Sequence, residues 1–477
     1  MAIKRYIADA DNTITNAFKE NLSTRGTGSN MGAAPILEVF SIYAQATTSS
    51  VEKARFLVKF PTADISSDRT ATTIPASGSV SFFLKLYNAR HADTLPDNFT
   101  LKVQAVNGAW EEGFGVDMEE YEDLTYDVEG SNWINRAGST AWSSAGGDVH
   151  ALPSFTQTFV SGTENLEIDI TEMVEDWIAS SSPRANHGLR VALDPSQEDS
   201  TARSYYTKKF FAREANDFFL RPCLEARWDS SLRDDNNNFY QSSSLAPAAD
   251  NLNKIFLYNK VRGGLKNIPA VGTSAIYVDL YEANGSSPTG SALTLAPNTP
   301  ATGTHVEAGV YSAEMALDTT LTSVIPVWHK GGVEYHTGSA ITVKSVNAKN
   351  DNSQAEYVTN ITNLKDSYTR HEIARFRLFT REKDWCPTLY TKATAEIEST
   401  IIPEAFWKIE RIVDGLNVID YGTGSFNHTK MSYDYSGSYF DLDVSLLESG
   451  YSYEMKFIYK IDGDYHEQPE TFKFRVD

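Results

Sequence analysis

The chain has 477 residues, of which 41% are hydrophobic and 12% aromatic, so it can build folded cores and is not intrinsically disordered. Its 63 Asp and Glu residues outnumber its 42 Lys and Arg residues, and the formal net charge of -21 disfavours nucleic acid as a partner. A chain of this length exceeds one hydrophobic core, and we expect about three domains.

The two cysteines and the lack of long apolar stretches indicate the cellular compartment in which the chain is expected to fold. Cys223 and Cys386 fall in different predicted domains, so we expect no disulfide framework, and folding in a reducing cytoplasm fits. The start, MAIKRYIADA, lacks the apolar core of a signal peptide. No stretch approaches the roughly 20 apolar residues of a membrane span, so we expect none.

The first 34 residues carry a weak metal pattern and a loop pattern. Asp9 and Asp11 have the spacing of the first half of a calcium loop, but the glycine and the distal glutamate of an EF-hand are missing. A turn or a strand end is therefore the favoured interpretation, and calcium at Asp9 and Asp11 is a weak candidate; the sequence predicts no other cofactor. Residues 15–34, rich in Asn, Ser, Thr and Gly, are predicted to form an exposed loop.

The next stretches predict a sandwich with one helix. ILEVFSIYAQA, KARFLVKFP, SVSFFLKLYNAR and FTLKVQAV alternate apolar and polar positions, as half-buried antiparallel strands do. Within residues 166–228 an amphipathic helix, capped by Asp169 or Thr171, is followed by the strands NHGLRVAL and PCLEARW. Its apolar face is formed by Ile170, Met173, Val174, Trp177 and Ile178.

Residues 110–148 differ in composition from the predicted strands before them and contain the first candidate site. The segment is acidic, rich in glycine and aromatic, and contains Trp110, Trp133 and Trp142. Exposed Trp133 and Trp142 beside Asn132 and Asp148 would make a platform on which a sugar stacks while polar neighbours bind its hydroxyls. The favoured alternative is that these aromatics form the loop's own small core and pin it to the sandwich.

These blocks carry a resemblance to a known family. ADADNTI, WEEGFGVD, IDITEMVEDWI followed by NHGLRVAL, and TKKFFARE resemble the DNRLRE or disaggregatase-related family of carbohydrate-binding-like β-sandwiches over about residues 5–229. The resemblance implies a jelly-roll sandwich and, in some members, binding of acidic polysaccharide. The acidic charge of this chain would repel polyanions.

The second half predicts two further domains. Residues 230–251 read as a polar linker, residues 252–346 as an immunoglobulin-like β-sandwich, and residues 347–477 as a C-terminal β-sandwich after residues 1–229. The fold class is therefore all-β: a jelly-roll-like sandwich with one short helix, followed by two smaller immunoglobulin-like sandwiches in series.

The strand RFRLFTR contains the second candidate site. Its alternation places Arg375, Arg377 and Arg381 on one face, opposite Phe376 and Leu378. This cationic face would either dock an acidic partner or pair across strands with nearby carboxylates, and the sequence favours neither.

A second resemblance indicates the biological setting of the chain rather than a ligand or a reaction. IARFRLF, YVTNITNLKDSY and SYDYSGSYFDLDVSLL, with the opening MAIKRYIADADNTITNAF, are similar to virion structural proteins of large tailed phages of marine bacteria. The resemblance implies a non-enzymatic virion component of tail, neck or baseplate periphery, assembled in the host cytoplasm. Its partners would be other virion proteins and copies of itself.

Two other functions stay open. The first is a glycan-binding adhesin or receptor-binding module that uses the N-terminal sandwich to recognise a host surface glycan. The second, less favoured, is a polysaccharide-degrading enzyme that uses the paired carboxylates of EDLTYDVE and DYSGSYFDLD. Acidic pairs are common in so acidic a chain, so we expect no enzyme and no catalytic residues.

Overall fold

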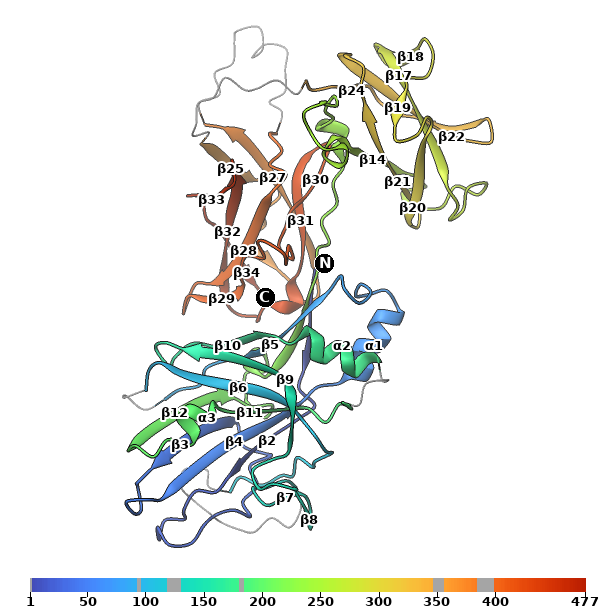
Figure 1. Cartoon of the computed structure of the whole chain (residues 1–477). Helices are drawn as coiled ribbons and strands as arrows, with labels where there is room; N and C mark the ends of the chain where they lie inside the picture. The colour runs from blue at the N-terminus through green and yellow to red at the C-terminus, as the bar shows by residue number, and fades with distance from the viewer. Residues whose placement is uncertain (1, 92–95, 118–129, 180–183, 346–355, 384–398) are drawn as a thin grey trace. The chain divides into compact units, whose positions relative to one another are not determined.

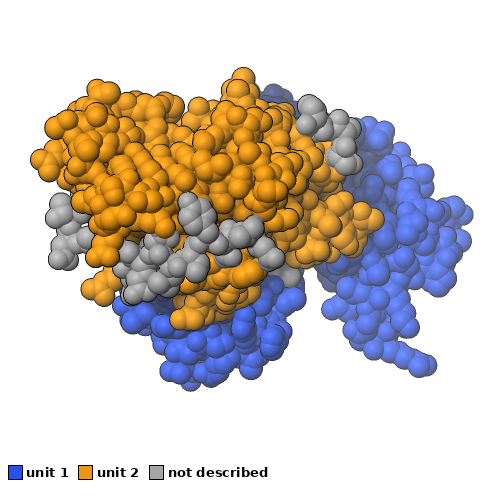
Figure 2. All heavy atoms as spheres, turned by 90° about the horizontal axis from the view of Figure 1, so that it is seen from below, with its two compact units in different colours: residues 1, 230–477 blue, residues 2–229 orange. Residues whose placement is uncertain are grey.

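The computed structural model describes all residues except 1, 92–95, 118–129, 180–183, 346–355 and 384–398. Cys386 and the carboxylates of EDLTYDVE lie outside the described residues. The chain divides into two compact units, residues 2–229 and residues 230–477 (Figure 2). In both units the regular secondary structure is mainly β-strand (Figure 1), so the predicted all-β class is confirmed. Among the described residues, no helix has the length and apolar character needed to cross a membrane.

The unit of residues 2–229 is a two-sheet β-sandwich with antiparallel pairing. The smaller sheet has the strand order β1 (Ile3–Ile7), β13 (Cys223–Arg227), β5 (Ser81–Leu86) and β10 (Leu166–Asp169). The larger sheet has the order β12 (Ser204–Phe211), β3 (Ile36–Tyr43), β4 (Val51–Lys59), β11 (Leu189–Leu193), β6 (Phe99–Val106) and β9 (Val149–Phe159), and β2 (Ala10–Thr15) also pairs with β4. A short hairpin is formed by β7 (Asn135–Ala137) and β8 (Thr140–Ala141).

The core of this unit lies between the two sheets. Alternate residues of strands in both sheets contribute fully buried side chains to one cluster, among them Val39, Phe56, Val58, Phe82, Leu84, Leu224 and Leu189. The predicted helix is α2 (Thr171–Ala179), whose Met173, Val174 and Trp177 join this core together with Ile170, the residue before the helix. The Asp169 carboxylate accepts a hydrogen bond from the Thr171 N–H at 2.9 Å. Helical periodicity therefore placed the buried face correctly.

Two further helices were not predicted. The helix α1 (Thr62–Thr70) buries only Ile65 and lacks an apolar stripe, so its sequence TADISSDRT gives no helical signal. It lies beside α2 (Figure 1), and the Arg69 guanidinium forms two hydrogen bonds of 2.6 Å with the Glu175 carboxylate on α2. The single turn α3 (Pro195–Glu198) is capped by Asp194, which accepts from the Ser196 N–H. Tertiary contacts, rather than amphipathicity, account for α1.

In the unit of residues 230–477 the strands form two sets of sheets. The first is a nine-stranded sheet of β14 (Asn253–Tyr258), β21 (Val310–Leu317), β20 (Ala301–Glu307), β17 (Ile276–Asn284), β22 (Ser323–Lys330) and β23 (Val333–Thr337), with β18 (Ser287–Thr289), β19 (Leu295–Ala296) and β24 (Ile341–Thr342) beside them. A separate hairpin has β15 (Lys260–Val261) and β16 (Gly264–Leu265). Tyr311 and Trp328 are fully buried within the nine-stranded sheet's core.

The second set is a sandwich at the C-terminal end of the chain. One sheet has the order β25 (Tyr357–Ile361), β27 (Ile373–Glu382), β31 (Gly437–Asp443) and β30 (Ser432–Asp434). The other has the order β26 (Ser367–Tyr368), β34 (Phe472–Val476), β32 (Ser452–Ile461), β28 (Ala405–Arg411) and β29 (Leu416–Ile419), with β33 (Asp464–Glu467) beside β32.

Short 3₁₀ turns occur in both units of the chain, at η1 (Phe218–Leu220), η2 (Asp235–Asn237), η3 (Ala248–Asn251) and η4 (Val444–Leu446).

Residues 230–251 make specific contacts within their own unit. Arg233 pairs in parallel with Tyr433, and Tyr240 pairs in parallel with Lys344. The Tyr433 hydroxyl accepts from the Arg233 guanidinium at 2.9 Å and donates to the Asp235 carboxylate at 2.7 Å. Polar residues of the predicted linker are therefore hydrogen-bonded within the unit rather than only to solvent.

Candidate functional site

The tryptophans predicted for a sugar-stacking platform form a small core instead. Trp133 and Trp142 are 8% and 5% exposed. They pack with three buried apolar residues and one partly buried tryptophan, which are Ile14, Leu57, Val106 and Trp110. The expectation of an exposed platform is wrong, and the alternative, in which the aromatics pin the loop to the sandwich, is confirmed. Burying an indole removes a large apolar area from water, which favours this arrangement.

The polar residues predicted to bind hydroxyls hold the loop's own backbone. The Asn132 side-chain oxygen accepts from the N–H groups of Ile134 and Asn135 at 2.9 and 2.7 Å, and its carbonyl accepts from the Trp142 indole at 2.9 Å. The Asp148 carboxylate accepts from the N–H groups of Ser143 and Ser144 at 2.6 and 2.7 Å. Asn and Asp commonly close turns in this way.

Gly146 allows the loop to approach Trp133. Its φ of 89° is left-handed, and a Cβ at this position would lie 2.9 Å from the Trp133 ring. On the same side, the Arg55 guanidinium lies 5.1 Å from the centre of the Trp133 ring and donates to the Gly146 carbonyl at 2.8 Å. The ring is therefore enclosed by the chain itself.

Asn30 is a structural residue that the sequence did not reveal. The segment around it was predicted to be exposed, but Ser29, Asn30 and Met31 are buried. The Asn30 amide donates to the carbonyls of Glu112 and Ser131 at 2.7 and 2.8 Å and accepts from the Gly115 N–H at 2.9 Å. Polar composition predicted exposure, whereas the side chain satisfies the backbone of a second loop.

The weak calcium candidate separates into an exposed and a buried carboxylate. Asp9 is exposed, whereas Asp11 in β2 is fully buried and accepts from the Arg213 N–H at 2.6 Å. Burial raises the pKa of Asp11 to about 7, and the neighbouring carboxylates of Glu112 and Glu214 add to this rise against the Arg213 hydrogen bond. In the described part of the chain, no three His, Cys, Asp or Glu side chains gather closely enough to hold a metal ion.

The predicted cationic face of β27 is largely occupied by cross-strand pairs. Phe376, Leu378 and Thr380 are buried, so the alternation is confirmed. The Arg375 guanidinium binds both oxygens of Asp441 at 2.7 and 2.8 Å. The Arg377 guanidinium binds both oxygens of Asp434 at 2.9 and 2.8 Å.

Arg381, the third predicted member, donates to the carbonyl of Glu382 at 3.2 Å. Of the two interpretations that the sequence left open, cross-strand pairing describes Arg375 and Arg377. Docking of an acidic partner at this face stays a prediction.

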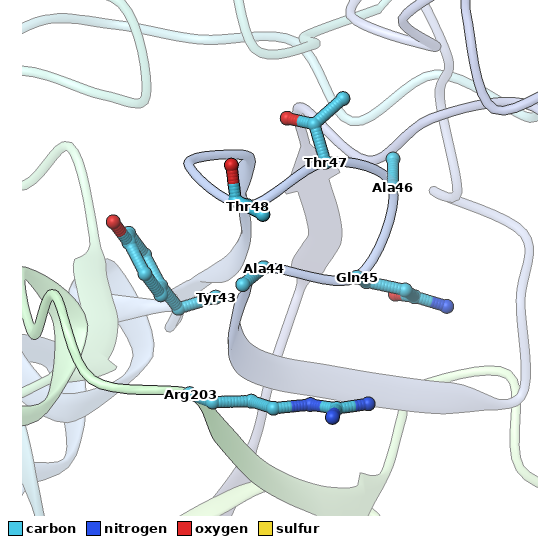
Figure 3. Close-up of a pocket in the computed structure, with 7 residues that line it drawn as sticks. All are labelled: Tyr43, Ala44, Gln45, Ala46, Thr47, Thr48 and Arg203. Atoms are coloured by element: carbon cyan, nitrogen blue, oxygen red, sulfur yellow. The ribbon is translucent and has the colours of Figure 1, made fainter.

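An open hollow of about 510 Å³ lies in the unit of residues 2–229 and was not predicted (Figure 3). It is formed by the turn between β3 and β4 together with the residue that precedes β12, and its lining residues are Tyr43, Ala44, Gln45, Ala46, Thr47, Thr48 and Arg203. The two segments meet because β12 pairs with β3, which places Ser204 opposite Tyr43. No local motif marks such a site, since its parts lie far apart in the sequence.

No protein-family model and no curated protein sequence matches the chain. Among solved structures, the chain is similar to a marsupial T cell receptor, at 9% identity over 50% of this chain and 71% of that chain, with a TM-score of 0.17. It is also similar to the Yersinia pseudotuberculosis adhesin InvE, at 12% identity over 47% of this chain and 54% of that chain, with a TM-score of 0.14. TM-scores this low carry no argument about the fold or the function.

Proposed function

We propose that the chain is a non-enzymatic structural component of a phage virion, in the tail, neck or baseplate periphery, which acts through protein–protein contacts. The proposal begins from the resemblance of the N- and C-terminal blocks to virion proteins. The observation that supports a contact role is the turn between β28 and β29, where Ile412 and Val413 are 41% and 70% exposed.

This turn is held in place from within. Arg411, only 7% exposed, binds both oxygens of Asp414 at 3.0 and 2.7 Å and one oxygen of Glu448 at 2.7 Å. The N–H of Ile412 donates to the Ser452 carbonyl at 3.0 Å. A held turn loses little conformational entropy when it docks, and burying an exposed aliphatic side chain stabilises a complex by about 1.5–3 kcal/mol. The turn therefore suits an apolar contact with another protein.

The experiment tests assembly directly. We expect mass spectrometry of purified phage particles to detect the chain in several copies, and light scattering to show that the purified chain self-associates. The double variant I412S/V413S should weaken self-association by at least about tenfold, from the lost apolar burial. V333S, which changes a valine that is 54% exposed on β23, is the matched control and should assemble normally. A chain that is monomeric and absent from particles would end the proposal.

A further inference from the structure

Two β-hairpins in the unit of residues 230–477 share one turn geometry and carry opposite charges. In the hairpin of β15 and β16, Arg262 and Gly263 have φ angles of 53° and 83° and connect the two paired strands directly. In the hairpin of β32 and β33, Asp462 and Gly463 have φ angles of 54° and 95°. Left-handed φ at both central residues is typical of the two-residue type I′ turn, which fits the twist of paired strands. Both tips are therefore fixed in shape by short turns.

The basic hairpin, residues 260–266, exposes three cations that have no carboxylate partner among the described residues: Lys260, Arg262 and Lys266. Three such cations within seven residues are unusual in a chain of net charge -21. Val261 and Leu265, which lie between them, are 45% and 38% exposed. The hairpin therefore presents positive charge together with apolar side chains to solvent.

Asn259 holds the base of the basic hairpin. Its N–H donates to the Gly309 carbonyl at 2.7 Å, and its side-chain amide donates to the Lys266 carbonyl at 2.6 Å. The Lys266 N–H in turn donates to the Asn259 carbonyl at 3.0 Å. These bonds use the backbone of the hairpin and leave its charged side chains facing solvent. A hairpin held in this way loses little conformational entropy when it docks.

The acidic hairpin, residues 458–467, presents the opposite charge. Asp462 and Asp464 are exposed, and within the described part of the chain neither forms an ion pair. The one lysine of this hairpin, Lys460, is neutralised by an ion pair of 3.0 Å with a carboxylate outside it. All four residues of β33 are exposed, and Tyr465 among them is 42% exposed. The acidic hairpin thus offers carboxylates beside an aromatic ring.

Charge complementarity indicates the occupant of the basic hairpin. Opposite charges on two rigid surfaces attract each other and fix their register. At physiological salt, screening over about 8 Å makes these local charges more important than the net charge of each copy. Both halves of the contact are present in one chain, so a second copy supplies the acidic surface.

We propose that the basic hairpin of one copy of the chain docks on the acidic hairpin of a second copy. Because the two hairpins differ, the contact is head-to-tail and can continue from copy to copy. The apolar side chains of the basic hairpin would pack on the Tyr465 ring while the charges pair around them. This inference rests on the proposed role in protein–protein contacts, and its contact is separate from the turn of Ile412 and Val413.

Charge reversal tests the contact. In about 50 mM salt, K260E/K266E and D462R/D464K should each weaken self-association of the full chain by at least about tenfold, because each places like charges opposite one another. Sedimentation equilibrium measures this association. An equimolar mixture of the two variants should recover it to within about threefold of the unchanged chain, because each reversed hairpin then meets its complement.

R90E/R203E is the matched control, since it changes the net charge by the same amount as K260E/K266E at two exposed arginines outside both hairpins. Its association should stay within about threefold of that of the unchanged chain, and thermal unfolding should show that all variants fold. Equal association of K260E/K266E and the unchanged chain would overturn the proposal. A mixture of the two reversed variants that stays dissociated would also overturn it.

A different occupant of the basic hairpin would give a different result. If a peptide of glutamates bound the unchanged chain but not K260E/K266E, while self-association stayed the same, the hairpin would serve another acidic protein and the proposal would fall.

The structural role is tested separately, by detection of the chain in phage particles and by I412S/V413S. A loss of association in I412S/V413S with no response to charge reversal would overturn only this inference. A chain that is monomeric yet present in particles would do the same, and the structural role would stand.

Discussion

Two loops of the unit of residues 2–229 differ in whether their polar and aromatic side chains have partners within the chain. The segment of residues 110–148 has the residue types of a glycan platform, yet Trp133 and Trp142 are buried and Asn132 holds backbone N–H groups. The turn of residues 43–48 has an ordinary composition, yet its polar side chains face solvent around a hollow. Residue type alone therefore did not identify the available groups. What distinguishes the two loops is whether the chain itself supplies each side chain with a partner.

Removing a tryptophan of the first loop should cause the greatest loss of stability. Because Trp133 is buried against the sandwich, W133A should lower the free energy of unfolding by about 3–5 kcal/mol, measured by urea denaturation. T140A, a change at an exposed position of the neighbouring hairpin, should stay within about 0.5 kcal/mol of the unchanged chain. A loss below about 1 kcal/mol for W133A would mean that the ring is not part of a core.

The second test uses the buried Asp11, whose N–H is bound by Glu112 of the first loop. The pKa of Asp11 is raised from 3.8 to about 7, chiefly by burial. Between these values the folded chain holds a proton that the unfolded chain has released, so this group's contribution to stability falls as pH rises. D11N, which mimics the protonated acid, should therefore gain stability relative to the unchanged chain between pH 4 and pH 8.

The size of that gain has an upper bound of about 4 kcal/mol, because one pKa unit corresponds to about 1.4 kcal/mol. Urea denaturation at both pH values measures the difference between the two proteins. D9N changes the exposed neighbouring carboxylate and is the matched control. A D11N difference that is the same at pH 4 and pH 8 would contradict the raised pKa.

A smaller effect on the free energy of unfolding is expected in the other unit. There, the arginines of β27 form ion pairs with aspartates, but these pairs lie closer to solvent. Arg375 and Asp441 are 50% and 30% exposed, and Arg377 and Asp434 are 30% and 22% exposed. Double-mutant cycles to alanine should give couplings of about 0.2–1 kcal/mol, with the less exposed pair at the upper end. Couplings that stay above about 2 kcal/mol in 1 M salt would indicate pairs that are more buried than the structure shows.

The smallest effect on stability is expected in the second loop. Since Arg203 makes one hydrogen bond of 3.3 Å and is exposed, R203A should change the free energy of unfolding by no more than about 0.5 kcal/mol. Together with W133A, this result would separate side chains that build the sandwich from side chains that are available to a ligand. A loss of more than about 2 kcal/mol would place Arg203 among the structural residues.

Features that depend on local periodicity could be predicted from the sequence. The apolar stripe of α2 followed from a spacing of three and four residues, and the strand β27 from strict alternation, because each period repeats the geometry of its element. The all-β class followed in the same way from many short alternating strands with turn residues between them. In contrast, α1 gave no periodic signal, since it buries only Ile65 and is tied to α2 by an ion pair.

Which polar and aromatic side chains face solvent depends on long-range contacts of the folded chain. Asn30 binds the carbonyls of Glu112 and Ser131, which lie far from it in the sequence, and the pairing of β12 with β3 brings Arg203 to the hollow that Tyr43 lines. A hydrogen-bond partner far away in the sequence leaves no mark near the residue that it satisfies. The sequence could therefore identify residue types that can bind sugars or cations. Long-range pairing alone determined that the loop around Trp133 uses these side chains to hold its own backbone, whereas the turn at residues 43–48 does not.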